Sequence, residues 1–206
     1  MPLIRLYLFR HGETEYNRQW RFQGHLDIPL NSKGERQAGD LVPLLAPLNL
    51  QAMLSSDLKR ASQTARIVAQ CLGIPQHSHP GLREAHLGDA QGLTREEIAA
   101  RFGAEAIERW KSYNLTDADI SYPGGETGLQ VMKRVFEALE LAVRSRPDIL
   151  RWGVCTHGGV IRRVAQKLLP QGSDPVAIPN GVIYEITFDT QADQWRFGPR
   201  LTPPLE

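Results

Sequence analysis

One short apolar run, residues 3–9 (LIRLYLF), constrains the fold of this chain strongly because of how it ends. All of its residues except Arg5 are apolar, which is typical of a strand covered on both faces of a sheet. The next two residues are Arg10 and His11, and burying an Arg beside a His is costly unless both meet an anion. The sequence therefore predicts a strand that ends at an anion-binding site.

Segments with strand-like and helix-like patterns alternate along most of the chain, which predicts a layered α/β fold with a mostly parallel sheet. Ser32 with Glu35 indicates a helix start, and Pro43 is expected to kink or end that helix. The helical pattern over residues 94–112 is expected to break near Gly103. Strands are expected at 3–9, 51–55, 152–156, 181–188 and 194–198, and further helices at 58–72, after the turn at 123–125, and at 160–169.

Composition excludes several classes of partner. The 206 residues carry a formal net charge of +1, so no overall field attracts nucleic acid or a membrane surface. No apolar run approaches the ~20 residues that span a bilayer, and the N-terminus lacks the small-residue cleavage site of a signal peptide. We therefore expect a cytoplasmic protein. Cys71 and Cys155 lie in apolar stretches and are expected to be small core residues rather than a disulfide.

A later strand is expected to end before His157-Gly158-Gly159, much as the first ends before His11. Ligands of open parallel sheets bind beyond the carboxyl ends of the strands, so neighbouring strands would bring both histidines to one crevice. The glycines let backbone N–H groups approach a ligand, and the helix that follows offers its N-terminus to an anion. The junction between the expected strand at 51–55 and the helix that follows it contributes Arg60, whose planar guanidinium matches phosphate oxygens. Together these residues predict a phosphate pocket.

The ordered set of motifs resembles the histidine phosphatase superfamily, which includes the cofactor-dependent phosphoglycerate mutases. The resemblance extends over about residues 3–190. It implies a three-layer α/β/α sandwich with a mostly parallel central sheet, a single phosphoglycerate mutase-like domain over residues 1–206, and a substrate-selecting lid at about residues 86–128. The matching motifs are Arg10-His11-Gly12-Glu13-Thr14 with Asn17, Phe22-Gln23-Gly24, Ser55-Ser56-Asp57-Leu58-Lys59-Arg60-Ala61 with Thr64-Ala65, Glu84-Ala85-His86-Leu87-Gly88, and His157-Gly158-Gly159.

The resemblance implies that His11 is a nucleophile that carries the phosphoryl group as phosphohistidine. One tautomer is required, in which the ring nitrogen away from phosphorus donates to a carbonyl or similar group. Glu84 is then the acid that protonates the leaving oxygen, and water hydrolyses the phosphohistidine. The other residues that the resemblance assigns to the phosphoryl group are Arg10, Arg60 and His157, which stabilise its charge, and Asn17, Gln23, Gly24 and Gly158, which bind it.

Four side chains near these motifs have more than one interpretation. Asp89 is a second candidate for the acid, or else a solvated loop carboxylate. Glu13 is interpreted as a positioning residue. Glu126 is a candidate for substrate binding or for helix capping, and His86 either faces the substrate or has no part in the reaction.

Neither a metal nor a cofactor is expected. No spacing among the histidines and cysteines resembles a metal site, and the common nucleotide-binding motifs are absent. Two arginines and a histidine already supply the positive charge. The expected partner is a small-molecule phosphomonoester, with no nucleic acid and no membrane. Monomer and homodimer both remain open, although strands near 181–198 offer an edge to a partner.

Two branches of the family differ in what becomes of the phosphohistidine, and the sequence carries features of both. Arg95 and Lys111 resemble cations that bind substrate in the mutases. Ser112 stands where mutases typically have a second Arg, Leu87 stands where they have Tyr, and residues 123–127 resemble the phosphatase branch. We therefore favour a phosphatase, with a cofactor-dependent phosphoglycerate mutase as the alternative.

A third hypothesis, a non-catalytic phosphate-binding protein, predicts the loss of a motif residue, and none is lost. The substrate stays open among broad-specificity phosphomonoesters, phosphosugars, phosphoserine and α-ribazole phosphate. Candidate residues for an apolar rim are Trp20, Phe22, Trp110 and Tyr113, although aromatic residues near loops also serve packing alone.

Overall fold

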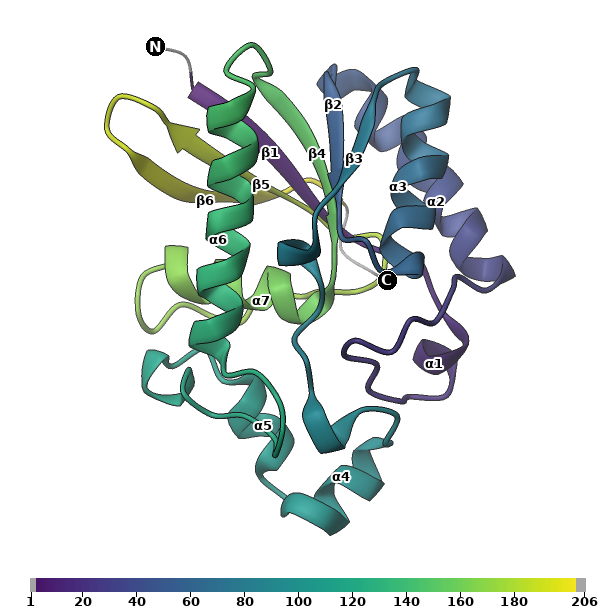
Figure 1. Cartoon of the computed structure of the whole chain (residues 1–206), viewed down its shortest axis with the longest axis vertical. Coiled ribbons are helices and arrows are strands. Elements are labelled where there is room, and N and C mark those ends of the chain that lie inside the picture. Colours follow the sequence, from purple (N-terminus) through teal and green to yellow (C-terminus); the bar gives the residue numbers. More distant parts are fainter. Residues whose placement is uncertain (1–2, 203–206) are drawn as a thin grey trace.

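A single six-stranded sheet forms the centre of the molecule, as a computed structural model describing residues 3–202 shows (Figure 1). Its spatial order is β3-β2-β4-β1-β5-β6. Strand β1 pairs in parallel with β4, and β2 pairs in parallel with β3 and β4, whereas β5 is antiparallel to β1 and β6. The strands are β1 (Leu3–Arg10), β2 (Ala52–Ser55), β3 (Gln76–Ser78), β4 (Arg151–Thr156), β5 (Ile183–Asp189) and β6 (Gln194–Arg200).

Helices cover both faces of this sheet, which confirms the predicted α/β class with a mostly parallel sheet. Helices α2 (Ser32–Leu45) and α3 (Lys59–Leu72) lie on one face, and α6 (Gly128–Ser145) and α7 (Gly158–Leu168) lie on the other. The remaining helical segments are α1 (Glu15–Arg18), α4 (Arg95–Phe102), α5 (Ala106–Lys111) and the 3₁₀ turns η1 (Ala46–Leu48), η2 (Pro80–Leu82), η3 (Gly88–Ala90) and η4 (Leu115–Asp117).

The two faces of the sheet bury separate sets of side chains because successive residues of a strand point in opposite directions. In β1, Leu6 and Leu8 pack toward α6 and α7, whereas Tyr7 and Phe9 pack toward α2 and α3. Val154 and Cys155 of β4 divide between the faces in the same way. This double burial explains why the first strand is apolar at almost every position.

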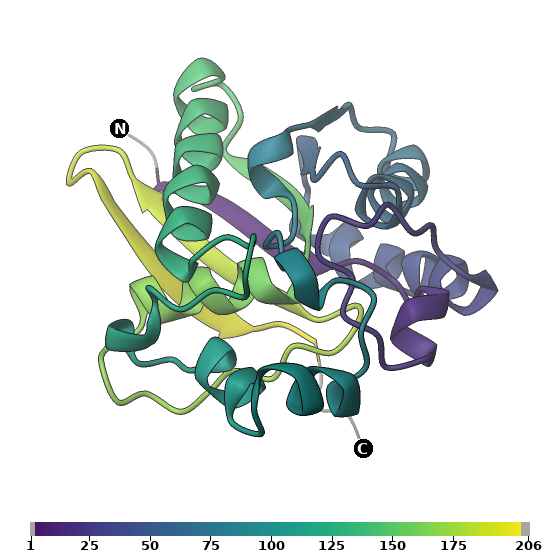
Figure 2. The same ribbon diagram turned by 60° about the horizontal axis from the view of Figure 1, so that its bottom comes forward.

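The pairing of β1 with β4 brings the two histidine motifs together. Arg10 at the end of β1 lies opposite Thr156 at the end of β4, so the next residues, His11 and His157, follow at the same edge of the sheet. Figure 2 shows α4 and α5, the teal helices of the segment 86–128 that was predicted to form a lid, in the lower part of the view.

Several local predictions need correction. Helix α2 begins at Ser32 as expected, but its N-cap is Asn31, whose side chain accepts from the Gly34 N–H, rather than the Ser32–Glu35 pair. The helix continues through Pro43 and ends two residues later, at Leu45. Cys155 is buried and Cys71 is exposed, so only one of the two cysteines is a core residue, and both are free thiols.

Within residues 3–202, no helix combines the length and apolarity that crossing a membrane requires.

Two glycines of α2 allow a direct test of how tightly the first loop packs. A Cβ on Gly34 would lie 2.1 Å from the Glu13 carbonyl oxygen, whereas a Cβ on Gly39 meets nothing within 4 Å. We expect Gly34→Ala to lower the free energy of unfolding by ~1–3 kcal/mol because backbone must move. Gly39→Ala should raise it by ~0.5–1 kcal/mol, since Ala is the better helix former. Urea denaturation of both variants measures this, and similar effects of the two substitutions would contradict the close packing.

Candidate active site

A cavity of about 660 Å³ opens at the carboxyl edge of the parallel strands. Its walls come from the loop after β1, the start of α3, the loop before the lid, the lid itself and the N-terminus of α7. Among the residues assigned from the sequence, those that line it are Arg10, His11, Asn17, Gln23, Gly24, Arg60, Glu84 and Gly158. The fold therefore brings to one cavity residues that lie as far apart in the chain as Arg10 and Gly158.

His11 is held in a single tautomer. Its Nδ1 lies 2.6 Å from the Gly12 carbonyl oxygen, and because a carbonyl only accepts, Nδ1 must carry the proton. The lone pair is therefore on Nε2. The main-chain carbonyl of His11 accepts from the Asn180 side chain at 2.7 Å, which fixes the backbone as well.

The His11 ring is also neutral. Burial lowers the pKa of His11 well below its ordinary value, and the nearby positive charges of Arg60 and Arg10 lower it further. An unprotonated Nε2 is the state that a nucleophile requires.

Arg10 and Arg60 present partly unsatisfied guanidinium groups to the same space. Arg60 donates to the carbonyls of Gly24 and Leu26, both at 2.8 Å, and Arg10 donates to the Ile178 carbonyl at 2.7 Å. Burial lowers the pKa of each guanidinium to about 10, so both stay charged at neutral pH. Each Nε is buried without a partner among residues 3–202.

His157 lies next to His11 and is not among the residues that line the cavity. Their ring centroids are 5.1 Å apart, in an edge-on arrangement. His157 is fully buried, and neither ring nitrogen has a partner within the described part of the chain. An orphaned buried polar group costs ~1–3 kcal/mol. Unsatisfied groups on His157, Arg10 and Arg60 at one edge therefore fit an anion with several acceptor oxygens, such as phosphate.

Glu84 lies in the loop between η2 and η3, at the N-terminus of α7. Its carboxylate accepts from the Gly159 N–H and from the Ala85 N–H, both at 2.9 Å. A Cβ on Gly159 would lie 2.2 Å from Glu84 Oε1, so the glycine permits this approach. An acidic group thus lines the same cavity as the two guanidinium groups.

Four smaller residues complete the wall. Asn17 and Gln23 both contact Thr14 through their amide oxygens, which leaves their amide N–H groups to donate. Gly24 has a left-handed backbone (φ 52°), and its carbonyl accepts from Arg60. Gly158 is the first residue of α7.

The structure shows where each of the side chains with more than one interpretation lies. Glu13 lines the cavity, but its carboxylate is bound by Lys33 and Asn31. Asp89, His86 and Glu126 do not line it. Asp89 pairs with Arg101 on the surface, which fits the solvated alternative. Helix α6 is capped by Thr127 with Gln130, so Glu126 is not the cap.

Sequence reasoning missed two residues at the site. Asn180 orients the His11 backbone, and Arg162 lines the cavity one turn into α7. Asn180 lies in an irregular loop that has no motif or period to mark it. Arg162 lies four residues after Gly158, one helical turn into α7, and this spacing is the signal that could have identified it.

The lid contributes cations and aromatic groups. Arg95 and Lys111 line the cavity, as do Trp20, Phe22 and Trp110, whereas Tyr113 does not and donates to the Val176 carbonyl instead. Lys111 is half-buried, and its pKa is lowered by burial and by the positive charges of Arg162 and Arg95. Several positive charges therefore face the outer part of the cavity.

The buried neutral histidines predict a pH-dependent stability. The pKa of His157 is lowered well below its ordinary value by burial and by Arg60, so the unfolded chain binds a proton near pH 6.5 that the folded chain does not. The free energy of unfolding should therefore fall as pH decreases below about 6.5, by up to ~1.4 kcal/mol per pH unit for each such group. Urea denaturation at several pH values from 7 to 5.5 measures how the free energy of unfolding changes with pH. This change should be smaller for His157→Gln than for the unmodified chain, and equal changes would contradict a neutral buried His157.

Comparisons with known proteins agree with this geometry. Residues 6–197 match the sequence profile of the histidine phosphatase superfamily (branch 1). The glucosyl-3-phosphoglycerate phosphatase of Mycolicibacterium vanbaalenii is 34% identical over 207 residues, which covers 94% of this chain and 88% of that protein. The phosphoglycerate mutase-like protein 4 of Arabidopsis thaliana is 40% identical over 164 residues, which covers 78% of this chain and 69% of that protein.

Solved structures give the same result. A mycobacterial glucosyl-3-phosphoglycerate phosphatase in complex with VO₃ superposes with a TM-score of 0.82 at 29% identity, covering 94% of this chain and 97% of that one. The profile match extends over nearly the whole chain, and the matched region contains every motif residue that lines the cavity. The chain belongs to the histidine phosphatase superfamily.

Proposed function

We propose that this protein is a metal-independent phosphomonoester hydrolase that acts on a small phosphorylated metabolite through a phosphohistidine on His11. The observation that carries the proposal is the neutral His11 ring with its Nε2 lone pair, set beside buried guanidinium and imidazole groups that lack partners among residues 3–202. The relatedness to phosphatases supports it as well.

In the first step, His11 Nε2 attacks phosphorus and forms an N–P bond while the bond from phosphorus to the ester oxygen breaks. Arg10, Arg60 and His157 stabilise the negative charge on the phosphoryl oxygens. Glu84 donates its proton to the leaving oxygen, which departs as an alcohol. Asn17, Gln23, Gly24 and Gly158 hold the phosphoryl group in place.

In the second step, water attacks the phosphohistidine. Glu84, now a carboxylate, takes a proton from this water as the new P–O bond forms and the N–P bond breaks. Inorganic phosphate leaves, and His11 and Glu84 return to their starting protonation states.

A phosphoglycerate mutase is the second candidate, because Arg95 and Lys111 both line the cavity. Arg95, however, pairs with Glu108 on the lid surface, and Leu87 occupies the wall position where mutases have Tyr. The engagement of Arg95 by Glu108 and the apolar side chain of Leu87 both favour hydrolysis.

A paired assay separates the two functions. One arm measures phosphate release from a panel of phosphomonoesters, and the other measures conversion of 3- to 2-phosphoglycerate with 2,3-bisphosphoglycerate present. We expect release without interconversion, and EDTA should leave the rate unchanged. Efficient interconversion would establish the mutase, and EDTA inhibition that added metal reverses would contradict the metal-independent mechanism.

The nucleophile can be tested by substitution. His11→Ala should abolish phosphate release and the acid-labile phosphoenzyme while the protein stays folded, since His11 lies at a loop entry rather than in the hydrophobic core. His77→Ala, which removes an exposed histidine of β3, should leave the rate unchanged. A phosphoenzyme that persists in His11→Ala would rule out this nucleophile.

The acid can be tested with leaving groups of different pKa. For Glu84→Gln we expect kcat/KM for alkyl phosphates to fall by ~10²–10⁴-fold, whereas kcat/KM for p-nitrophenyl phosphate should change little, because a good leaving group needs no proton. Asp89→Asn is the matched control and should change neither. Selectivity in Asp89→Asn instead of Glu84→Gln would assign the acid to Asp89.

A further inference from the structure

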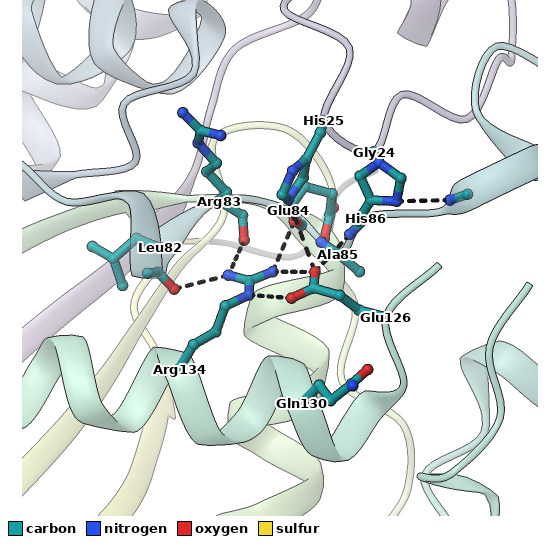
Figure 3. Close-up of polar contacts among 12 residues, drawn as sticks. Gly24, His25, Leu82, Arg83, Glu84, Ala85, His86, Glu126, Gln130 and Arg134 are labelled. Carbon is teal, nitrogen blue, oxygen red and sulfur yellow. Dashed lines mark hydrogen bonds and ion pairs between the residues drawn. The ribbon is translucent and has the colours of Figure 1, made fainter. Parts of the chain in front are cut away.

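The carbonyl of Glu84 lies in a polar network outside the cavity, which the catalytic steps above do not use. Figure 3 shows Arg134 of α6, Glu126 and His25 grouped around the loop that carries Glu84. None of these three side chains is among those that line the cavity. They are nevertheless largely buried, with side-chain exposures of 20% for Arg134 and 23% for Glu126.

The Arg134 side chain donates hydrogen bonds to main-chain carbonyls of the loop that carries Glu84. One terminal nitrogen donates to the carbonyls of Gly81 and Arg83 at 2.8 and 2.7 Å, and the other donates to the carbonyl of Glu84 at 2.9 Å. A planar guanidinium can bind several carbonyls at once with fixed geometry, and an ammonium group cannot reproduce this arrangement. The peptide groups before and after the Cα of Glu84 are thereby hydrogen-bonded to a side chain of α6.

Glu126 fixes Arg134 in that orientation. Its two carboxylate oxygens accept from Arg134 Nε and from the second terminal nitrogen at 2.7 and 2.8 Å, in a bidentate pair. The same carboxylate accepts from the His86 N–H at 2.7 Å, two residues beyond Glu84. Burial acts to raise the pKa of Glu126, but hydrogen bonds from Arg134 and His86 lower it overall, so the carboxylate is charged.

His25 connects this network to the phosphate-binding loop. Its Nε2 donates to the Glu84 carbonyl at 2.7 Å, so that carbonyl accepts from both His25 and Arg134. His25 itself lies between Gly24 and Leu26, whose carbonyls are bound by Arg60. The backbone of the acid is thus joined to the loop that surrounds the phosphate site.

We propose that Arg134 and Glu126, together with His25, are positioning residues that set the location of the Glu84 carboxyl relative to His11. The proposal rests on the assignment of Glu84 as the acid. Because proton transfer requires the acid within hydrogen-bonding reach of the leaving oxygen, a displacement of about 1 Å can cost ~10²-fold in rate. The loss falls on substrates whose leaving group needs the proton.

The test compares kcat/KM for an alkyl phosphate with kcat/KM for p-nitrophenyl phosphate. In Arg134→Gln, the alkyl rate should fall by ~10²-fold and the p-nitrophenyl rate by less than about threefold. Arg134→Lys should recover little of the alkyl rate, since it cannot bind the three carbonyls together. Arg144→Gln is the matched control, an ion-paired Arg of the same helix whose partner is Asp193, and should resemble the unmodified enzyme.

Glu126→Gln serves if Arg134→Gln does not fold, because it keeps the shape of the side chain and removes only its charge. It should give the same selectivity for leaving groups with a smaller loss. In the double variant Glu84→Gln/Arg134→Gln, the alkyl rate should equal that of Glu84→Gln alone, because a proton donor that is absent cannot be misplaced.

The outcomes separate this inference from the proposed function. Equal losses on both substrates in Glu84→Gln would overturn the acid assignment, and this inference with it. Selectivity in Glu84→Gln but equal losses in Arg134→Gln and Glu126→Gln would leave the acid assignment standing and show that the network only stabilises the fold. Losses that multiply in the double variant would also overturn the positioning role.

Discussion

Two guanidinium groups at the end of a sheet, that of the buried Arg60 and that of the partly buried Arg10, are the constraint on which the rest of the site depends. Arg60 is only 1% exposed, and a buried charge must be met by dipoles or by a ligand. The protein meets it in part, with carbonyls of Gly24 and Leu26 for Arg60 and of Ile178 for Arg10. These contacts determine the course of two loops far apart in the chain. Each Nε is left without a hydrogen-bond partner among residues 3–202.

The same positive charges add to the effect of burial on the protonation state of His11. Burial, Arg60 and Arg10 together hold the ring neutral, and the Gly12 carbonyl holds its proton on Nδ1. The charges that suit an anion thus also help to keep Nε2 of His11 unprotonated. Unsatisfied buried polar groups are costly, and an anion that accepted their hydrogen bonds would remove this cost.

A second guanidinium group binds backbone carbonyls in the loop that carries Glu84. Arg134 binds Gly81, Arg83 and Glu84 as Arg60 binds Gly24 and Leu26, and His25 lies between the two sets. Irregular loops have no repeating hydrogen bonds of their own to fix them. Arg side chains from α3 and α6 supply the donors instead, which holds these two loops in place at the cavity.

The sequence by itself predicted every described strand except β3 (Gln76–Ser78), and most of the longer helices. A continuous apolar run indicates a strand buried on both faces, and apolar residues at helical spacing indicate a helix with one buried face. Both patterns can be recognised within a short stretch of sequence. The motif residues Arg10, His11 and Arg60 could be predicted as a set because each follows a recognisable strand end. The resemblance to a family then assigned their roles, which stay proposals until they are measured.

Tertiary structure alone decided the contacts between distant segments. The position of β4 beside β1 brings His157 to His11, and the Asn180 and Arg134 contacts join segments with no shared period. Local spacing also misjudged the exposure of Cys71 and the cap of α2, because both depend on which neighbour packs there. A one-dimensional pattern indicates which face of a helix or strand is buried, whereas the burial of a single residue and the partner that buries it are fixed only when the chain folds.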